Sequence, residues 1–129
     1  MGVILLMKRM YLNKTVETLI EDLFDVSKDS KLIFKHMHKE MVRKLKLKLD
    51  YINAADSFQW CIDHPLGKFE PLKGNYLHKY SIRLDKNYRL IISPNTSDYS
   101  REGLSKCEEY YIEGVVDYHG NGKHNWLIP

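Results

Sequence analysis

The sequence predicts an α+β domain in which two helices cover one face of a mostly antiparallel sheet. Two observations predict this class. Apolar residues recur at helical spacing between residues 16 and 52, and short alternating apolar segments separated by turn residues follow residue 68. A chain of 129 residues has the size of one domain, so we expect a single unit over 1–129.

The composition is that of a globular protein, with 43% hydrophobic and 29% charged residues. The longest apolar run, at 3–6, is far too short to cross a bilayer, and Lys8 and Arg9 follow it, which is the wrong order for a signal peptide. The six histidines form no paired ligand motif, and Cys61 and Cys107 lie outside any metal-ligand spacing. We therefore expect a cytoplasmic protein with reduced thiols, no membrane segment and no metal site.

The chain begins with a predicted strand over 3–12, bent near Lys8. Asn13 or Thr15 then caps a first helix, because each offers a side-chain oxygen to a backbone N–H that has no partner within the helix. That helix carries an i, i+3, i+4, i+7 apolar stripe with acidic residues on its other face, and it ends near 25–27.

A second helix is predicted from Asp29 or Ser30 to about Ala54. Inside it Leu45, Leu47 and Leu49 alternate with lysines, a pattern that by itself is typical of a strand. The surrounding residues keep helical spacing, and the segment contains neither Gly nor Pro. Helix is therefore the better interpretation, and the two helices form a hairpin.

The second half of the chain predicts strands at 69–72, 80–84, 88–93 and 110–116, which are three or four strands beyond the first. Residues 57–62 add one helical turn. The polar segment 94–108 is predicted to be a long loop, and regular structure is predicted to end at Gly120.

Positive charge is concentrated in two regions although the net charge is only +3. Residues 31–48 hold seven lysines and arginines against Glu40, and residues 68–89 hold six against Glu70 and Asp85. Such regions indicate a surface that faces a polyanion. The alternative for the first region is a helix face on which lysines are simply solvated.

Candidate functional residues lie on the later strands. Because successive strand residues point to opposite faces, Arg83 and Arg89 leave the sheet away from their aliphatic neighbours and form a cationic row opposite the helices. Lys73 stands at a turn, and Asp117-Tyr118-His119 closes the last predicted strand with a charge, a ring and a proton carrier. The alternative is that these arginines only keep the sheet soluble and that the triplet is simply the polar end of a strand where the chain returns to the surface.

Seven segments in order resemble the HigB branch of RelE-like toxins: KEM at 39–41, RKLKLKLD at 43–50, AADS at 54–57, PLKG at 71–74, YSIR at 80–83, YRLI at 88–91 and VVDYH at 115–119. The resemblance implies a RelE-like fold with a concave sheet, a domain core over about 7–119, a loop insertion at about 94–108 and an extra tail at 120–129. It also implies a ribosome-dependent mRNA endonuclease that uses no metal and no cofactor. In such enzymes the ribose 2′-hydroxyl attacks the adjacent phosphate.

Carried over by position, the resemblance assigns catalysis to the terminal triplet, Arg89 and Lys73. His119 would move the proton, Arg89 would stabilise charge, Tyr118 would stack on a base or orient the phosphate, and Asp117 would position its neighbours. The residues expected to contact the RNA backbone are Arg83, Lys79, Lys86, Arg43 and Lys46.

The sequence departs from the family pattern before the PLKG motif. Many relatives have an active-site histidine there, and this chain has Glu70. A carboxylate can serve as a base, or His64 or His78 can stand nearby, but an anion beside a scissile phosphate is unfavourable. The aspartate that often follows Lys-Gly is Asn75 here.

The implied partners are mRNA on the ribosome and a small antitoxin, typically a helix-turn-helix protein encoded by the adjacent gene. One alternative is a RelE-fold protein with weakened catalysis, in which Glu70 marks a lost site and the chain binds an antitoxin or RNA. Another is a nucleic-acid-binding repressor, which ranks last because this chain shows no helix-turn-helix pattern of its own.

Overall fold

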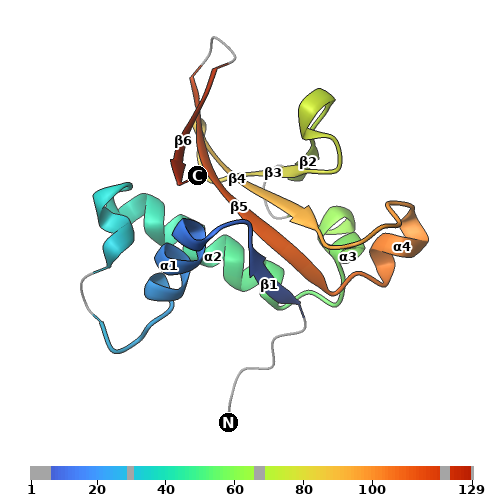
Figure 1. Ribbon diagram of the computed structural model, residues 1–129, viewed down its shortest axis with the longest axis horizontal. Coiled ribbons are helices and arrows are strands. Elements are labelled where there is room, and N and C mark those ends of the chain that lie inside the picture. The colour runs from blue at the N-terminus through green and yellow to red at the C-terminus, as the bar shows by residue number, and fades with distance from the viewer. Residues whose placement is uncertain (1–6, 29–30, 66–68, 120–122, 129) are drawn as a thin grey trace.

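The computed structural model describes residues 7–28, 31–65, 69–119 and 123–128. These residues form four α-helices, two short 3₁₀ turns and six strands, in an order that begins with a strand and a helical pair and continues mainly with strands (Figure 1). The elements are β1 (Lys8–Tyr11), α1 (Lys14–Leu23), a 3₁₀ turn (Leu32–Lys35), α2 (Lys39–Asn53), α3 (Phe58–Asp63), β2 (Phe69–Pro71), a second 3₁₀ turn (Gly74–Tyr76), β3 (Tyr80–Arg83), β4 (Tyr88–Pro94), α4 (Arg101–Ser105), β5 (Glu109–His119) and β6 (Lys123–Ile128).

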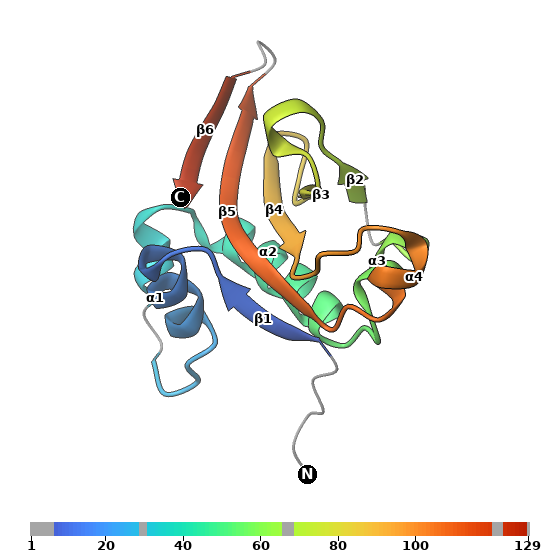
Figure 2. The same ribbon diagram turned by 45° about the vertical axis from the view of Figure 1, so that its right-hand side comes forward.

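The strands form one sheet in the order β1-β5-β4-β3-β2. Strand β1 runs parallel to the first part of β5, and β6 pairs antiparallel with its last part, so that both lie along the same edge of this long, curved strand (Figure 2). All other pairings are antiparallel. Helices α1 and α2 lie against one face, which confirms the predicted α+β class with a mostly antiparallel sheet.

Helix α1 begins where its cap allows. The N–H of Val16 donates to Asn13 Oδ1 at 3.0 Å, so the cap is Asn13 and not Thr15. The predicted stripe is buried, with Val16, Leu19 and Leu23 in the core. The strand before it begins at Lys8 among the described residues, and the predicted positions 3–6 lie outside them.

The predicted second helix is shorter than expected. Residues 32–35 form a 3₁₀ turn, His38 is extended (φ −78°, ψ 162°), and α2 begins at Lys39. The cause is a contact across the helical pair, in which the Leu32 N–H donates to the Asp22 carboxylate of α1 at 2.7 Å. Within α2, Leu45 and Leu49 are buried while Leu47 is 52% exposed, so the helical interpretation of the alternating leucines is confirmed.

Two regions predicted to be irregular contain regular elements. The segment 94–108 includes α4, which Ser100 caps by accepting the Gly103 N–H at 3.2 Å. The tail contains β6, so five strands follow the helices rather than three or four. The two predictions failed for different reasons. Helix α4 is short and polar, and its ion-pair partner Asp63 lies far away in the sequence. Strand β6 pairs with the end of β5 just before it, across a Gly-Asn-Gly segment that by itself predicts the end of regular structure.

Cys61 and Cys107 are buried free thiols. Among the described residues, no group of three or more His, Cys, Asp or Glu side chains is placed to hold a metal ion. None of the helices that the structure describes is long and apolar enough to span a membrane.

Candidate active site on the uncovered face of the sheet

Side chains of the central strands separate cleanly between the two faces of the sheet. Ile82, Leu90 and Val115 belong to the core beneath the sheet. Because strand residues alternate, Arg83 and Arg89 lie on the opposite face, which we call the open face. The two arginines are direct cross-strand partners on β3 and β4, and they begin a row that continues to Val116 on β5.

The paired arginines carry like charges directly opposite each other, an arrangement that costs about 0.2–1 kcal/mol in a sheet. Arg89 is oriented by its own hairpin, since its Nη1 donates to the carbonyl oxygens of Asp85 at 2.7 Å and Tyr88 at 3.1 Å. The Nε of Arg83 is buried and has no hydrogen-bond partner in the part of the chain that the structure describes. Both features would be relieved by an anion bound between the two guanidinium groups.

The next row on the open face is built from Glu70, Ser81, Ile91 and Gly114, which lie in register across β2, β3, β4 and β5. Ser81 and Ile91 are both buried, so the middle of this row is closed to solvent. Glu70 is exposed on the edge strand. The structure thus places a carboxylate one row from the arginines, at the position where many relatives of the resembled family have histidine.

A second charged pair lies in the same face, nearer the other end of β3. Lys79 forms a hydrogen-bonded ion pair with Glu113, whose side chain is only 4% exposed, and the Lys79 ammonium stands 5.9 Å from the centre of the Tyr76 ring. Glu113 lies where the pairing of β4 with β5 slips by one residue, which is a β-bulge. Sequence reasoning missed Glu113; the signal for it was an acid followed by glycine inside an apolar strand.

The predicted terminal triplet does not gather on the open face. Asp117 is the cross-strand partner of Tyr88, which packs on the core, so Asp117 lies on the helix-covered side and is 8% exposed. Tyr118 and His119 belong to the backbone of β5, where they pair with His124 and Lys123. The side chains of Tyr118 and His119 lie outside the described part of the structure, so their roles stay predictions.

The remaining predicted RNA contacts are spread over the molecule. Lys73 is exposed just before the second 3₁₀ turn, and Lys86 is exposed in the β3–β4 hairpin near the arginine pair. Arg43 and Lys46 are on α2, in the layer that covers the other face, where they form ion pairs with neighbouring acids and help line a mainly apolar groove of about 290 Å³.

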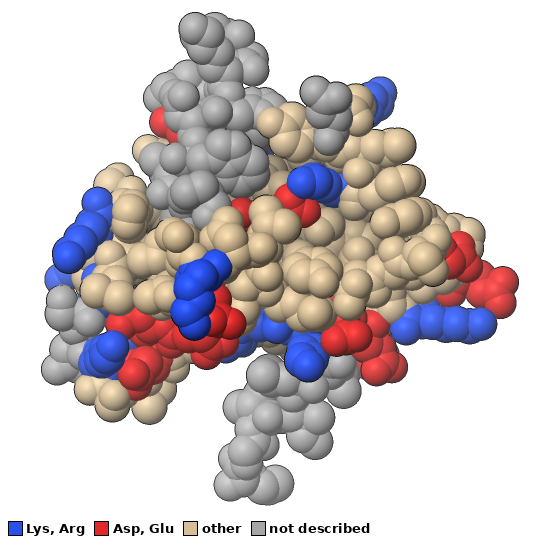
Figure 3. All heavy atoms as spheres, viewed as in Figure 1, with Lys and Arg blue, Asp and Glu red and all other residues tan. Residues whose placement is uncertain are grey.

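The space-filling view is consistent with this dispersal of charge (Figure 3). On the face shown, Lys and Arg are interspersed with Asp and Glu around α1 and form no single basic patch. The structure therefore does not bring the basic residues of α2 together with those of the sheet. Arg83 and Arg89 occupy directly opposing positions on two paired strands.

The comparison with protein families shows which family this chain belongs to. Residues 15–100 match the model of the HigB-like toxin family, described as the RelE-like toxin of the type II toxin–antitoxin system HigB. The chain belongs to this family. Searches of curated proteins and of solved structures gave no match.

Membership of this family has consequences for the partner and the fold of this HigB-like toxin. A toxin of a type II system implies an antitoxin partner, and the mixed α+β fold agrees with a RelE-like family. The matched residues include Glu70, Lys73, Arg83 and Arg89 but end before β5, so the family match does not extend to Asp117, Tyr118 and His119.

Proposed function

We propose that this HigB-like toxin is a metal-independent endoribonuclease that cuts mRNA on the ribosome, in the cytoplasm. The observation that carries the proposal is the Arg83–Arg89 pair, two cations that are direct cross-strand partners on the side of the sheet opposite the helix-covered core. A phosphodiester bound between them would neutralise their repulsion and pair with the buried Nε of Arg83.

The reaction is attack of the ribose 2′-hydroxyl on the adjacent phosphate, which leaves a cyclic phosphate and a free 5′-hydroxyl. The arginine pair would stabilise the charge that develops on the phosphorane oxygens. The resemblance assigns proton transfer to His119, but strand alternation places position 119 on the same side of β5 as Asp117, opposite the arginines. Tyr118 would orient the substrate and Lys73 would contribute positive charge. Asp117, buried beside Tyr88 on the other side of the sheet, would position its neighbours in β5 rather than touch RNA.

Glu70 is a second candidate for the general base. Its carboxylate is exposed and shares the open face with the arginines, one row away. The partner in the cell is proposed to be a small helix-turn-helix antitoxin encoded by the adjacent gene.

The proposal is tested with purified toxin, programmed ribosomes and a labelled mRNA. We expect wild-type protein to yield fragments with 2′,3′-cyclic phosphate and 5′-hydroxyl ends, unchanged by EDTA. Arg83→Ala and Arg89→Ala should each slow cleavage about 100-fold or more, because each removes charge stabilisation from the transition state. Lys14→Ala, which changes an exposed lysine of α1, is the control. Undiminished cleavage by both arginine variants would refute the assignment.

One observation favours a different function, a binding module that has lost catalysis. Glu70 replaces the histidine found in many relatives and adds an anion to the phosphate site. On that account wild-type protein binds its antitoxin but cuts no mRNA, and Glu70→His gains cleavage. Under the nuclease proposal wild-type protein is active and Glu70→Gln is impaired if Glu70 is the base.

A further inference from the structure

Two loops that are distant in sequence meet through a pair of stacked rings. His78 precedes β3 and Tyr99 follows β4, and their ring centroids are 3.6 Å apart with planes inclined by 7°. Both side chains are exposed, Tyr99 to 41%. Neither residue belongs to the arginine site, and the family resemblance assigns neither of them a fixed role.

The backbone of His78 is held in an uncommon conformation. Its φ is +70°, in the left-handed region that residues other than glycine rarely adopt. Two backbone hydrogen bonds tie its neighbour Lys79 in place, one from the Leu72 N–H at 2.9 Å to the Lys79 carbonyl and one from the Lys79 N–H at 3.0 Å to the Tyr76 carbonyl. The imidazole is therefore presented by a constrained turn.

The loop that carries Tyr99 is equally constrained. The Ser100 N–H donates to the Asp98 carboxylate at 3.0 Å, and the Asp98 N–H donates to Thr96 Oγ1 at 3.1 Å. The loop packs directly on α4, because a Cβ at Gly103 would stand 2.2 Å from the Asp98 carbonyl oxygen. Glycine is required at that position for the loop to lie where it does.

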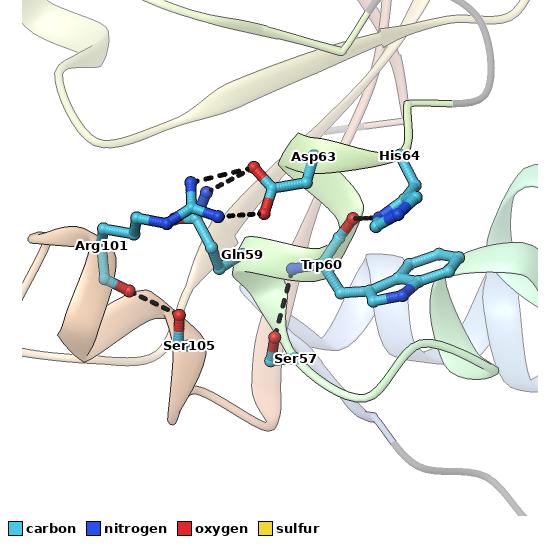
Figure 4. A network of polar contacts seen from close by, with 7 residues as sticks. All are labelled: Ser57, Gln59, Trp60, Asp63, His64, Arg101 and Ser105. Carbon is cyan, nitrogen blue, oxygen red and sulfur yellow. Dashed lines mark hydrogen bonds and ion pairs between the residues drawn. The ribbon is translucent and has the colours of Figure 1, made fainter.

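Helix α4 is in turn fastened to the body of the protein (Figure 4). The Arg101 guanidinium makes two hydrogen bonds to the Asp63 carboxylate of α3, at 3.1 and 2.6 Å, and Gln59 donates to the same carboxylate at 3.0 Å. Helix α3 is anchored in the core by Phe58 and Cys61. Tyr99 is thus supported through a chain of contacts, and little conformational entropy is lost when a ligand contacts its ring.

The stacked rings lie at the end of β3 that is opposite the arginine site. Lys79, directly after His78, points into the open face toward Glu113 and retains 31% side-chain exposure. Strand β3 separates His78 from Arg83 by about 17 Å, at a rise of about 3.3 Å per residue. Exposed flat rings at one end of a strand whose other end carries the proposed phosphate site have the chemistry that binds unstacked bases of single-stranded RNA.

We propose that His78 and Tyr99 form a preorganised stacking platform for a nucleobase of single-stranded RNA, a few nucleotides from the phosphate held by Arg83 and Arg89. This inference rests on the proposed function and deepens it. The platform is what the segment 94–108, with α4 as its support, contributes to substrate binding.

The test is fluorescence anisotropy with a labelled 2′-O-methyl RNA oligonucleotide, which wild-type protein cannot cut because the attacking hydroxyl is blocked. Tyr99→Leu should weaken binding about five- to a hundredfold, the effect of removing one base–aromatic stack. Tyr99→Phe keeps the ring and should bind like wild type. Leu77→Ala removes an exposed apolar side chain from the same loop as His78 and serves as the matched control.

A second series places a single abasic nucleotide at each position of the oligonucleotide. At one position the abasic substitution should weaken wild-type binding and leave Tyr99→Leu unaffected. Equal affinity of wild type and Tyr99→Leu, or no binding by wild type, overturns the platform, and so does a Tyr99→Leu variant that loses affinity for the antitoxin but not for RNA. Loss of cleavage in Arg89→Ala is measured separately, so failure of the platform and failure of the nuclease proposal are distinguishable.

Discussion

At the scale of single residues, the open face holds two kinds of charged pair. Arg83 and Arg89 face each other as like charges, whereas Lys79 is paired with the buried carboxylate of Glu113. Like charges at opposing positions favour an incoming anion, while an ion pair mainly holds its members in place. The phosphate is therefore expected at the arginines, with Lys79 at the edge of the RNA path.

The Lys79–Glu113 pair leads to an asymmetric prediction. Lys79→Met leaves a carboxylate buried without its partner and should lower the free energy of unfolding by about 3–5 kcal/mol. Glu113→Gln should cost clearly less, because the partly exposed ammonium of Lys79 can turn toward water. Urea denaturation of both variants and of the double variant measures the difference. An equal loss in the two single variants would contradict the predicted asymmetry.

At the scale of elements, periodicity identified the helices but not where they begin. The apolar stripe of α2 is visible in the sequence, and it correctly separates buried Leu45 and Leu49 from exposed Leu47. Residues before α2 are held by a tertiary contact instead, because Asp22 of α1 accepts hydrogen bonds from the Leu32 N–H and the Lys28 ammonium. The Asp22 carboxylate thus links the end of α1 to the 3₁₀ turn that precedes α2.

This link makes stability depend on pH in a defined direction. The backbone hydrogen bond from Leu32, followed by the Lys28 contact, lowers the pKa of Asp22 below its usual value. A lowered folded-state pKa stabilises the protein above the unfolded pKa of about 4, and that contribution is lost as pH falls. Asp22→Asn should therefore be less stable than wild type at pH 7, with a difference that shrinks toward pH 3. Urea midpoints across this range test it; a constant difference would contradict the assignment.

At the scale of the whole molecule, one core joins the helices to the covered face of the sheet and encloses both thiols. Burial raises the pKa of the Cys61 thiol to about 12 and also raises that of Cys107. Thiolate, the reactive form, is therefore scarce in the folded protein.

Thiol labelling should accordingly report opening of the fold. We expect native protein at pH 8 to react with Ellman's reagent far more slowly than protein in urea, for both cysteines. Cys107 follows α4 directly, so its labelling also tests the support of Tyr99. Rapid labelling of Cys107 with Cys61 protected would mean that α4 opens independently and would weaken the case for a preorganised platform.

The sequence by itself determined the α+β class, the helical stripes, the approximate strands and the placement of Arg83 and Arg89 on the face away from the helices. These features follow from local periodicity, which the chain carries wherever it folds. Tertiary structure decided the register that sets Arg83 opposite Arg89, the bulge that buries Glu113, the position of Asp117 on the covered face, and the addition of α4 and β6. The register and the bulge depend on how strands pair, and a one-residue change of register moves a side chain to the other face of the sheet. Helix α4 depends on its contact with Asp63, and β6 on the curved end of β5 with which it pairs.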